Sequence, residues 1–133
     1  MIQISVIMPV YNTPVPILKE AVDSILNQTF QDFEFIIIDD CSSDGSWEYL
    51  SSLRDSRIKL FRNTTNLGIA KTLNIGFRHA KGKYIARMDS DDVSMPDRLR
   101  RQFNFMERHP DVMVCGANTQ NFGSPPNHVH EIG

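Results

Sequence analysis

"FEFIIID", residues 33–39, is the stretch that decides the fold of this chain. It is nearly continuous in apolar residues, and "ISVIMPV", residues 4–10, has the same character. A strand with one wet face alternates apolar and polar residues, whereas a continuous run indicates burial on both faces, as in a parallel sheet. Further predicted strands cover residues 57–62, 83–88 and 112–117.

Helical patterns separate these predicted strands. Apolar residues recur at helical spacing in four segments, which begin near Ile17, Trp47, Leu73 and Leu99. Alternation of strands and helices predicts an α/β fold, with a mostly parallel central sheet and helices on both faces. Ligands of such sheets bind beyond the carboxyl ends of the strands. The length of 133 residues suits one domain.

Composition narrows the class of protein. Hydrophobic residues make up 41% and charged residues 23%, which is typical of a soluble globular domain. The formal net charge of -2 argues against a broad nucleic-acid-binding surface. Cys41 and Cys115 match neither a metal-binding spacing nor a disulfide framework, which favours a reducing compartment. The apolar start, residues 1–10, is too short for a membrane span and has no basic signal-peptide region.

Polar residues follow the ends of several predicted strands. They are Tyr11 and Asn12 after the first strand, Asp39 and Asp40 at the second, Asn66, Gly68 and Lys71 before the third helix, and Asp89, Asp91 and Asp92 after the fourth strand. Each one alone has an ordinary structural explanation as a turn, cap or bend residue. Their convergence on one edge of one sheet favours a binding site.

The acidic cluster in "MDSDDV", residues 88–93, predicts a metal site. Clustered carboxylates repel and raise one another's pKa, so a cation stabilises them. Hard oxygen ligands prefer Mg²⁺ or Mn²⁺ to zinc. Asp89 and Asp91 are expected to point the same way, because side chains alternate along a strand. For Asp92, a solvated turn before the next helix is the simpler interpretation.

Three longer segments resemble a known family. "SVIMPVYN" (5–12), "QTFQDFEFIIIDDCSSDGS" (28–46) and "NLGIAKTLNIGFRHAKGKYIARMDSDDVSMPDRL" (66–99) are similar to family 2 glycosyltransferases of the GT-A fold, a Rossmann-like fold of nucleotide-diphospho-sugar transferases. The likeness runs from about Ile4 to Gly116. It implies metal-dependent transfer of a sugar from a UDP-like nucleotide diphosphate donor to an acceptor hydroxyl, with inversion, in the synthesis of a cell-surface polysaccharide or glycan.

The resemblance also implies roles for individual residues. The donor-binding residues would be Pro9, Val10, Tyr11, Asn12, Asp39, Asp40, Gly68, Lys71, Asp89 and Ser90, and the metal ligands of Mn²⁺ or Mg²⁺ would be Asp91 and Asp89. Asp40 would accept the ring N–H of a uracil-like base, and Asp39 would support it or fix the loop. Asp91 would bind the metal directly.

The same resemblance predicts the domain organisation. Residues 1–120 would form the donor-binding domain, and residues 121–133 a linker or the truncated start of an acceptor-binding half. The catalytic base is expected beyond Gly133, so the chain is expected to bind donor without transferring sugar. Expected partners are a UDP-sugar and a saccharide or lipid-linked acceptor, with no nucleic acid and with a homo-oligomer possible. The expected location is cytoplasmic, with a peripheral position on the inner face of the membrane left open.

Two other functions compete with this one. A sugar-1-phosphate nucleotidyltransferase needs a glycine-rich, basic loop after the first strand, and "PVYNTPVPIL", residues 9–18, has no glycine and no basic residue. A non-catalytic nucleotide-binding module stays open, because acids at strand ends suit binding as well as catalysis.

Overall fold

The computed structural model describes residues 2–110, 114–115 and 130–132. Strands and helices alternate through most of the chain, as the sequence predicted. In order they are β1 (Ile4–Val10), α1 (Val15–Leu26), β2 (Phe33–Asp39), α2 (Ser46–Ser51), β3 (Ile58–Arg62), α3 (Ile69–His79), β4 (Tyr84–Arg87), α4 (Arg98–Arg108), β5 (Val114–Cys115) and β6 (His130–Ile132). The expected α/β class is confirmed.

The strands form one six-stranded sheet in the order β3-β2-β1-β4-β6-β5. Every neighbouring pair is parallel. From β1 the chain moves outward through β2 to β3, and then crosses back to place β4 on the other side of β1. The order therefore reverses between β1 and β4, and the edge beyond such a reversal is where open α/β sheets bind ligands.

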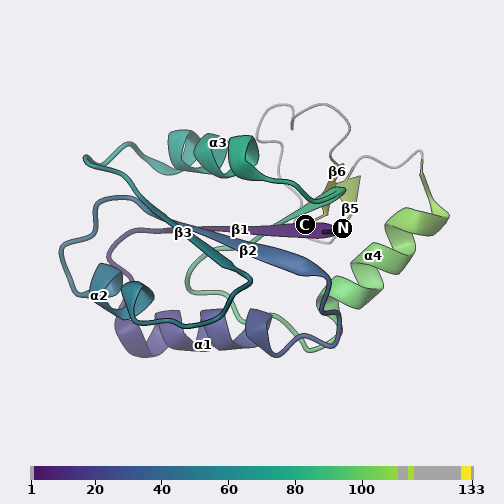
Figure 1. The fold of residues 1–133 in the computed structure, drawn as a ribbon, viewed down its shortest axis with the longest axis horizontal. Coiled ribbons are helices and arrows are strands. Elements are labelled where there is room, and N and C mark those ends of the chain that lie inside the picture. The colour runs from purple at the N-terminus through teal and green to yellow at the C-terminus, as the bar shows by residue number, and fades with distance from the viewer. Residues whose placement is uncertain (1, 111–113, 116–129, 133) are drawn as a thin grey trace.

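Helices cover both faces of the sheet, with α3 on one side and α1 and α2 on the other (Figure 1). Val6 and Met8 of β1 belong to the core cluster that contains α1, whereas Ile7 packs with Leu73 and Phe77 of α3. Alternate residues of β1 thus pack into the two hydrophobic cores on opposite faces of the sheet. This explains the continuous apolar run, because every position of β1 except the partly buried Pro9 is buried.

Helix α3 lies unusually close to the sheet at Gly76. A Cβ atom added there would come within 2.5 Å of Ile7 Cγ2 and 3.1 Å of Ile38 Cδ1. Only the missing side chain permits this approach. It fixes the height of α3 above β1, and so the position of the loop that precedes the helix.

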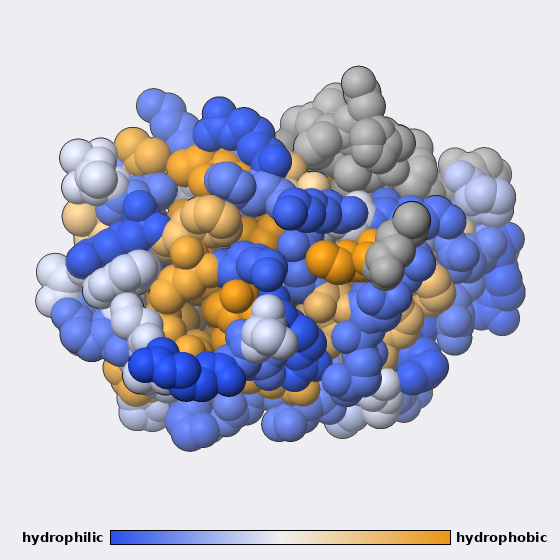
Figure 2. All heavy atoms as spheres, in the orientation of Figure 1, coloured by the Kyte–Doolittle hydropathy of each residue, from blue (hydrophilic) through white to orange (hydrophobic). Residues whose placement is uncertain are grey.

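Hydrophobic residues also gather on one outer face, between α3 and α1, while mostly hydrophilic residues cover the side over α4 (Figure 2). Within the described residues, no helix combines the length and the apolar character needed to cross a bilayer.

Residues 121–133 were predicted to be a linker or the truncated start of an acceptor-binding half. The structure describes only His130–Ile132 of the segment 121–133, and these residues form β6, paired in parallel with β4. The three described residues of this segment therefore belong to the central sheet. The sequence around these three residues has no pattern typical of a strand. They form β6 because β4 pairs with them. Of the predicted strand 112–117, the structure describes Val114–Cys115 as β5.

Candidate functional site

A cavity of about 360 Å³ opens at the carboxyl edge of the sheet, beside the reversal between β1 and β4. It is lined by Pro9, Val10, Tyr11, Asp40, Asn66, Gly68, Ile69, Thr72, Asp89 and Ser90. These residues come from the end of β1, the loop after β2, the start of α3 and the turn after β4. The polar segments that were predicted to converge do meet around this cavity.

Some predicted residues lie elsewhere, and some lining residues were not predicted. Asn12, in the loop after β1, Asp39, the last residue of β2, and Lys71, exposed on α3, are not among the lining residues. The sequence predicted that Asn66 lies at this edge of the sheet but assigned it no role in binding. Ile69 and Thr72 were not assigned at all, although their spacing of three residues puts them on one face of the first turn of α3.

Asp40, the residue predicted to bind a nucleotide base, is held by a network of hydrogen bonds. It is only 4% exposed. Its Oδ1 accepts hydrogen bonds from Asn63 Nδ2 and from the backbone N–H of Leu67, both at 2.8 Å. Its Oδ2 accepts from Asn66 Nδ2 at 3.1 Å and from the backbone N–H of Gly68 at 2.9 Å.

These four bonds use the whole acceptor capacity of the Asp40 carboxylate, which has about four lone-pair sites. Asp40 also lines the cavity, and its bond to a nucleotide base stays a prediction. Its carboxylate organises the loop before α3, whose last residue, Gly68, has a φ of +90° that L side chains rarely adopt. The loop then presents Asn66 to the cavity.

Asp39 is completely buried behind this loop. Its Oδ2 accepts the backbone N–H of Ser42 at 3.0 Å and lies 3.5 Å from Arg62 Nε. The Arg62 guanidinium covers the ring of Trp47, with 4.9 Å between the guanidinium carbon and the ring centroid. These contacts tie the loop after β2 to the end of β3 and to α2.

The loop after β1 is held against the loop after β2. Asn12 donates its backbone N–H to Ser42 Oγ at 2.9 Å, and Asn12 Oδ1 accepts the backbone N–H of Ser43 at 2.8 Å. Asn12 has a φ of +48°, in the left-handed region that asparagine tolerates better than most residues. Asn12 thus joins two loops of the site without lining the cavity.

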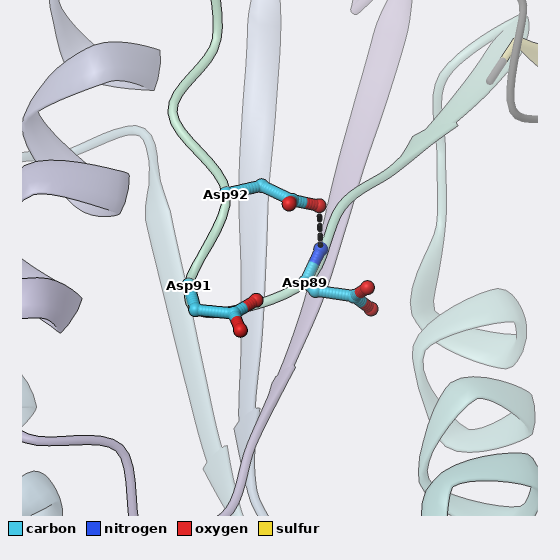
Figure 3. A group of neighbouring side chains, drawn as sticks. All are labelled: Asp89, Asp91 and Asp92. Atoms are coloured by element: carbon cyan, nitrogen blue, oxygen red, sulfur yellow. Dashed lines mark hydrogen bonds between the residues drawn. The ribbon is translucent and has the colours of Figure 1, made fainter.

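The acidic residues form a tight turn beyond β4 (Figure 3). One carboxylate oxygen each from Asp89, Asp91 and Asp92 lies within 4.8 Å of the others. Asp92 Oδ2 accepts the backbone N–H of Asp89 at 3.2 Å, and the Asp91 carboxylate is directed toward Asp89. The grouping arises from the turn, since β4 ends at Arg87, so the expected strand alternation does not apply here. The turn also brings Asp92 into the group.

The electrostatics of this turn suit a cation. Burial raises the pKa of Asp89 above its usual value, and the neighbouring Asp92 and Asp91 raise that pKa further, while Arg87 opposes them. The three aspartates thus concentrate negative charge beside the cavity, and their group includes no basic side chain. Three hard oxygen donors fit Mg²⁺ or Mn²⁺, which take carboxylate ligands together with water and phosphate oxygens.

Comparisons with known proteins agree with this geometry. The family model described as Glycosyl transferase family 2 matches residues 5–132. The chain is 45% identical over 115 residues to an uncharacterised glycosyltransferase of Haemophilus influenzae, covering 85% of this chain and 46% of that protein. It is 38% identical over 135 residues to the Escherichia coli UDP-Glc:alpha-D-GlcNAc-diphosphoundecaprenol beta-1,3-glucosyltransferase WfaP, covering 92% and 52%. The chain therefore spans about half the length of these relatives.

Solved structures of similar fold contain nucleotides. The S. aureus TarS 1-349 structure in complex with UDP matches with a TM-score of 0.78 and 29% identity, covering 90% of this chain and 38% of that one. The mannosyltransferase PcManGT from Pyrobaculum calidifontis, in complex with GDP-Man and Mn²⁺, matches with a TM-score of 0.76 and 26% identity, covering 88% and 36%.

Proposed function

The chain belongs to glycosyl transferase family 2, and on this premise we propose that the cavity binds the nucleotide diphosphate of a UDP-linked sugar donor. One observation carries the proposal. The cavity joins a rigid polar loop, organised by Asp40, to an acidic turn suited to a divalent cation. A nucleotide diphosphate presents the matching pair of groups, a flat base and an anionic diphosphate.

The base would bind at the end of the cavity formed by Tyr11, Asn66 and Ile69. Tyr11 and Ile69 are 54% and 57% exposed, so they offer apolar surface to a flat ring. Asn66 donates its Nδ2 to Asp40, which fixes the amide. Its Oδ1 accepts no hydrogen bond from the described residues, so it remains an acceptor for a ring N–H. Uracil has such a donor, whereas adenine has a ring acceptor on its pairing edge.

The diphosphate would bind beside the acidic turn. Asp91 and Asp89 would hold Mn²⁺ or Mg²⁺, with Asp92 as a third oxygen donor. Such an ion, when bound, acts as a Lewis acid that stabilises the charge of the departing diphosphate. The acids alone would repel a diphosphate, so donor binding itself requires the cation. The Mn²⁺ in the PcManGT complex supports this assignment.

The transfer would invert the anomeric carbon and would need a general base for the acceptor hydroxyl. Within the described lining, the two carboxylates are Asp40, which is saturated with hydrogen bonds, and Asp89, which belongs to the proposed metal group. We therefore place the base outside the described residues. The acceptor would be a saccharide or a lipid-linked saccharide of a cell-surface glycan. The lipid-linked form is supported by the name of WfaP, which includes a GlcNAc-diphosphoundecaprenol.

Isothermal titration calorimetry tests the proposal. UDP with Mn²⁺ should bind at least about fivefold more tightly than ADP with Mn²⁺, because a lost hydrogen bond in the base pocket costs on the order of 1 kcal/mol or more. Asp91→Ala should remove the Mn²⁺-dependent part of UDP binding. Asp32→Ala, a change at an exposed acid far from the cavity lining, is the matched control and should bind like the wild type. Equal affinities for UDP and ADP would contradict the base assignment.

A further inference from the structure

Thr13 contacts the acidic turn from behind the cavity. Its Oγ1 lies 2.5 Å from Ser90 Oγ, across 77 positions of sequence. Ser90 stands between Asp89 and Asp91 and lines the cavity, whereas Thr13 is 7% exposed and does not line it. A buried hydroxyl outside the site thus bonds to the residue at the centre of the acidic turn.

This bond is important because few other hydrogen bonds connect the acidic turn to the rest of the described structure. Its hydrogen bonds between Asp89 and Asp92 are internal, at 3.1 Å from Asp92 N to Asp89 O and 3.2 Å from Asp89 N to Asp92 Oδ2. Upstream, Met88 N donates to Ile7 O of the sheet at 3.0 Å. Within the described residues, the bond to Thr13 is the one hydrogen bond that joins positions 90 and 91 to another loop.

Thr13 is itself well fixed. Its carbonyl oxygen lies 3.0 Å from the hydroxyl of the fully buried Ser46, at the start of α2. The preceding residue, Asn12, bonds to Ser42 and Ser43 of the loop after β2. A β-branched threonine also has a restricted side-chain torsion. The Thr13 hydroxyl therefore comes from a rigid support, while the turn that it touches is exposed.

We propose that Thr13 is a positioning residue for the acidic turn. Through Ser90, its hydroxyl holds Asp89 and Asp91 at the spacing that a divalent cation needs. Like charges repel, so the carboxylates of a metal-free turn tend to separate, and the bond to Thr13 resists this separation. A site held in its binding geometry loses less entropy when the cation binds. The inference rests on the proposed function, because it presupposes that the turn binds a cation.

The test measures Mn²⁺ affinity without nucleotide, by the electron paramagnetic resonance signal of free Mn²⁺. Thr13→Val keeps the side-chain shape and removes the hydroxyl, and it should weaken Mn²⁺ binding about fivefold, the effect of one net hydrogen bond. Thr13→Ser should restore the affinity to within about twofold of the wild type. Ser90→Ala should cause the same loss as Thr13→Val. The double variant should bind no more weakly than either single variant, because all three lack the same bond.

Thr29→Val is the matched control. It removes a threonine hydroxyl that bonds to a carboxylate, Asp97 Oδ1 at 2.7 Å, far from the cavity lining, and should leave Mn²⁺ affinity unchanged. Wild-type affinity in Thr13→Val, or additive losses in the double variant, would overturn the proposal. If Thr13→Val does not fold, the test uses Ser90→Ala alone. A Mn²⁺ affinity of Ser90→Ala equal to that of the wild type would then overturn the proposal. Failure of the wild type to bind Mn²⁺ would contradict the proposed function itself, which separates the two results.

Discussion

At the scale of single residues, Asp40 shows how one buried carboxylate can order a loop. Its four hydrogen bonds come from residues 23 to 28 positions later in the chain. Bonds to a charged acceptor are stronger than neutral ones, and each buried donor left without a partner costs free energy. Asp40 therefore contributes to stability as well as to the shape of the cavity.

Asp40→Asn should lower the free energy of unfolding by about 3 kcal/mol, because an amide group would turn its NH₂ toward N–H donors and lose the charge. Urea denaturation measures this change. The control is Asp32→Asn, at an exposed side chain, which should stay within about 0.5 kcal/mol of the wild type. A base-reading role without a structural role would instead leave the unfolding curve of Asp40→Asn unchanged.

Asp89 gives the stability a dependence on pH. Its pKa in the folded protein is raised by burial and by Asp92, so ionisation of Asp89 costs more in the folded state than in the unfolded state. The favourable contribution is complete below the ordinary pKa of about 4 and is lost as the pH rises through the raised pKa.

Asp89→Asn should therefore stabilise the metal-free protein at pH 7 and have no such effect near pH 3. The gain should stay below about 1 kcal/mol, because the side chain is exposed and solvent screens its charge. Thermal unfolding in a chelating buffer at the two pH values measures it. An equal gain at both values would show that charge is not the cause. The same variant should lose the stabilisation that added Mn²⁺ gives to the wild type.

At the scale of elements, the position of α3 determines the cavity. The loop organised by Asp40 leads directly into this helix, and the first turn of α3 supplies Ile69 and Thr72 to the lining. Gly76 allows the helix to approach β1. The packing of one helix on one strand thus sets the distance between the loop and the acidic turn.

Gly76→Ala should destabilise the fold by about 1–3 kcal/mol, the usual cost of overpacking a core. Alanine normally stabilises a helix by about 1 kcal/mol over glycine, so a loss here would be due to the contact with Ile7. Denaturation of Gly76→Ala beside Asn74→Ala, on the exposed face of the same helix, measures the difference. A gain in stability at Gly76→Ala would show that Ile7 moves aside without cost.

At the scale of the whole molecule, the cavity is built from four connected segments: the loops after β1 and β2, the loop before α3 and the acidic turn. The loop after β1 joins the loop after β2 through Asn12 and joins the acidic turn through Thr13. Binding a nucleotide diphosphate and a cation to this assembly would stabilise the folded state as a unit.

UDP with Mn²⁺ at about 100 times its dissociation constant should stabilise residues 1–133 by about 2.7 kcal/mol. Sugar transfer by this chain should nevertheless be at least about 10²–10⁴-fold slower than by a protein extended to the length of its relatives, because the general base would be missing. Thermal shifts and a transfer assay at equal donor occupancy measure the two effects. Comparable transfer by the two proteins would place the base within residues 1–133.

The sequence by itself determined the fold class and the edge of the sheet that carries the site. The continuous apolar runs of β1 and β2 indicate burial on both faces, which a mostly parallel sheet covered by helices provides. The alternation with helical patterns then places the polar strand ends on one edge. Both signals are local, so they can be read within windows of a few residues.

The tertiary structure alone decided the roles of individual residues at that edge. The partners of Asp40 lie more than twenty positions away, and Ser90, which bonds to the Thr13 hydroxyl, lies 77 positions away. The three acids meet through a turn that strand periodicity does not describe, and β6 exists because β4 pairs with it. Hydrogen bonds between distant segments depend on where the whole chain has packed, and no local pattern of residue types encodes them.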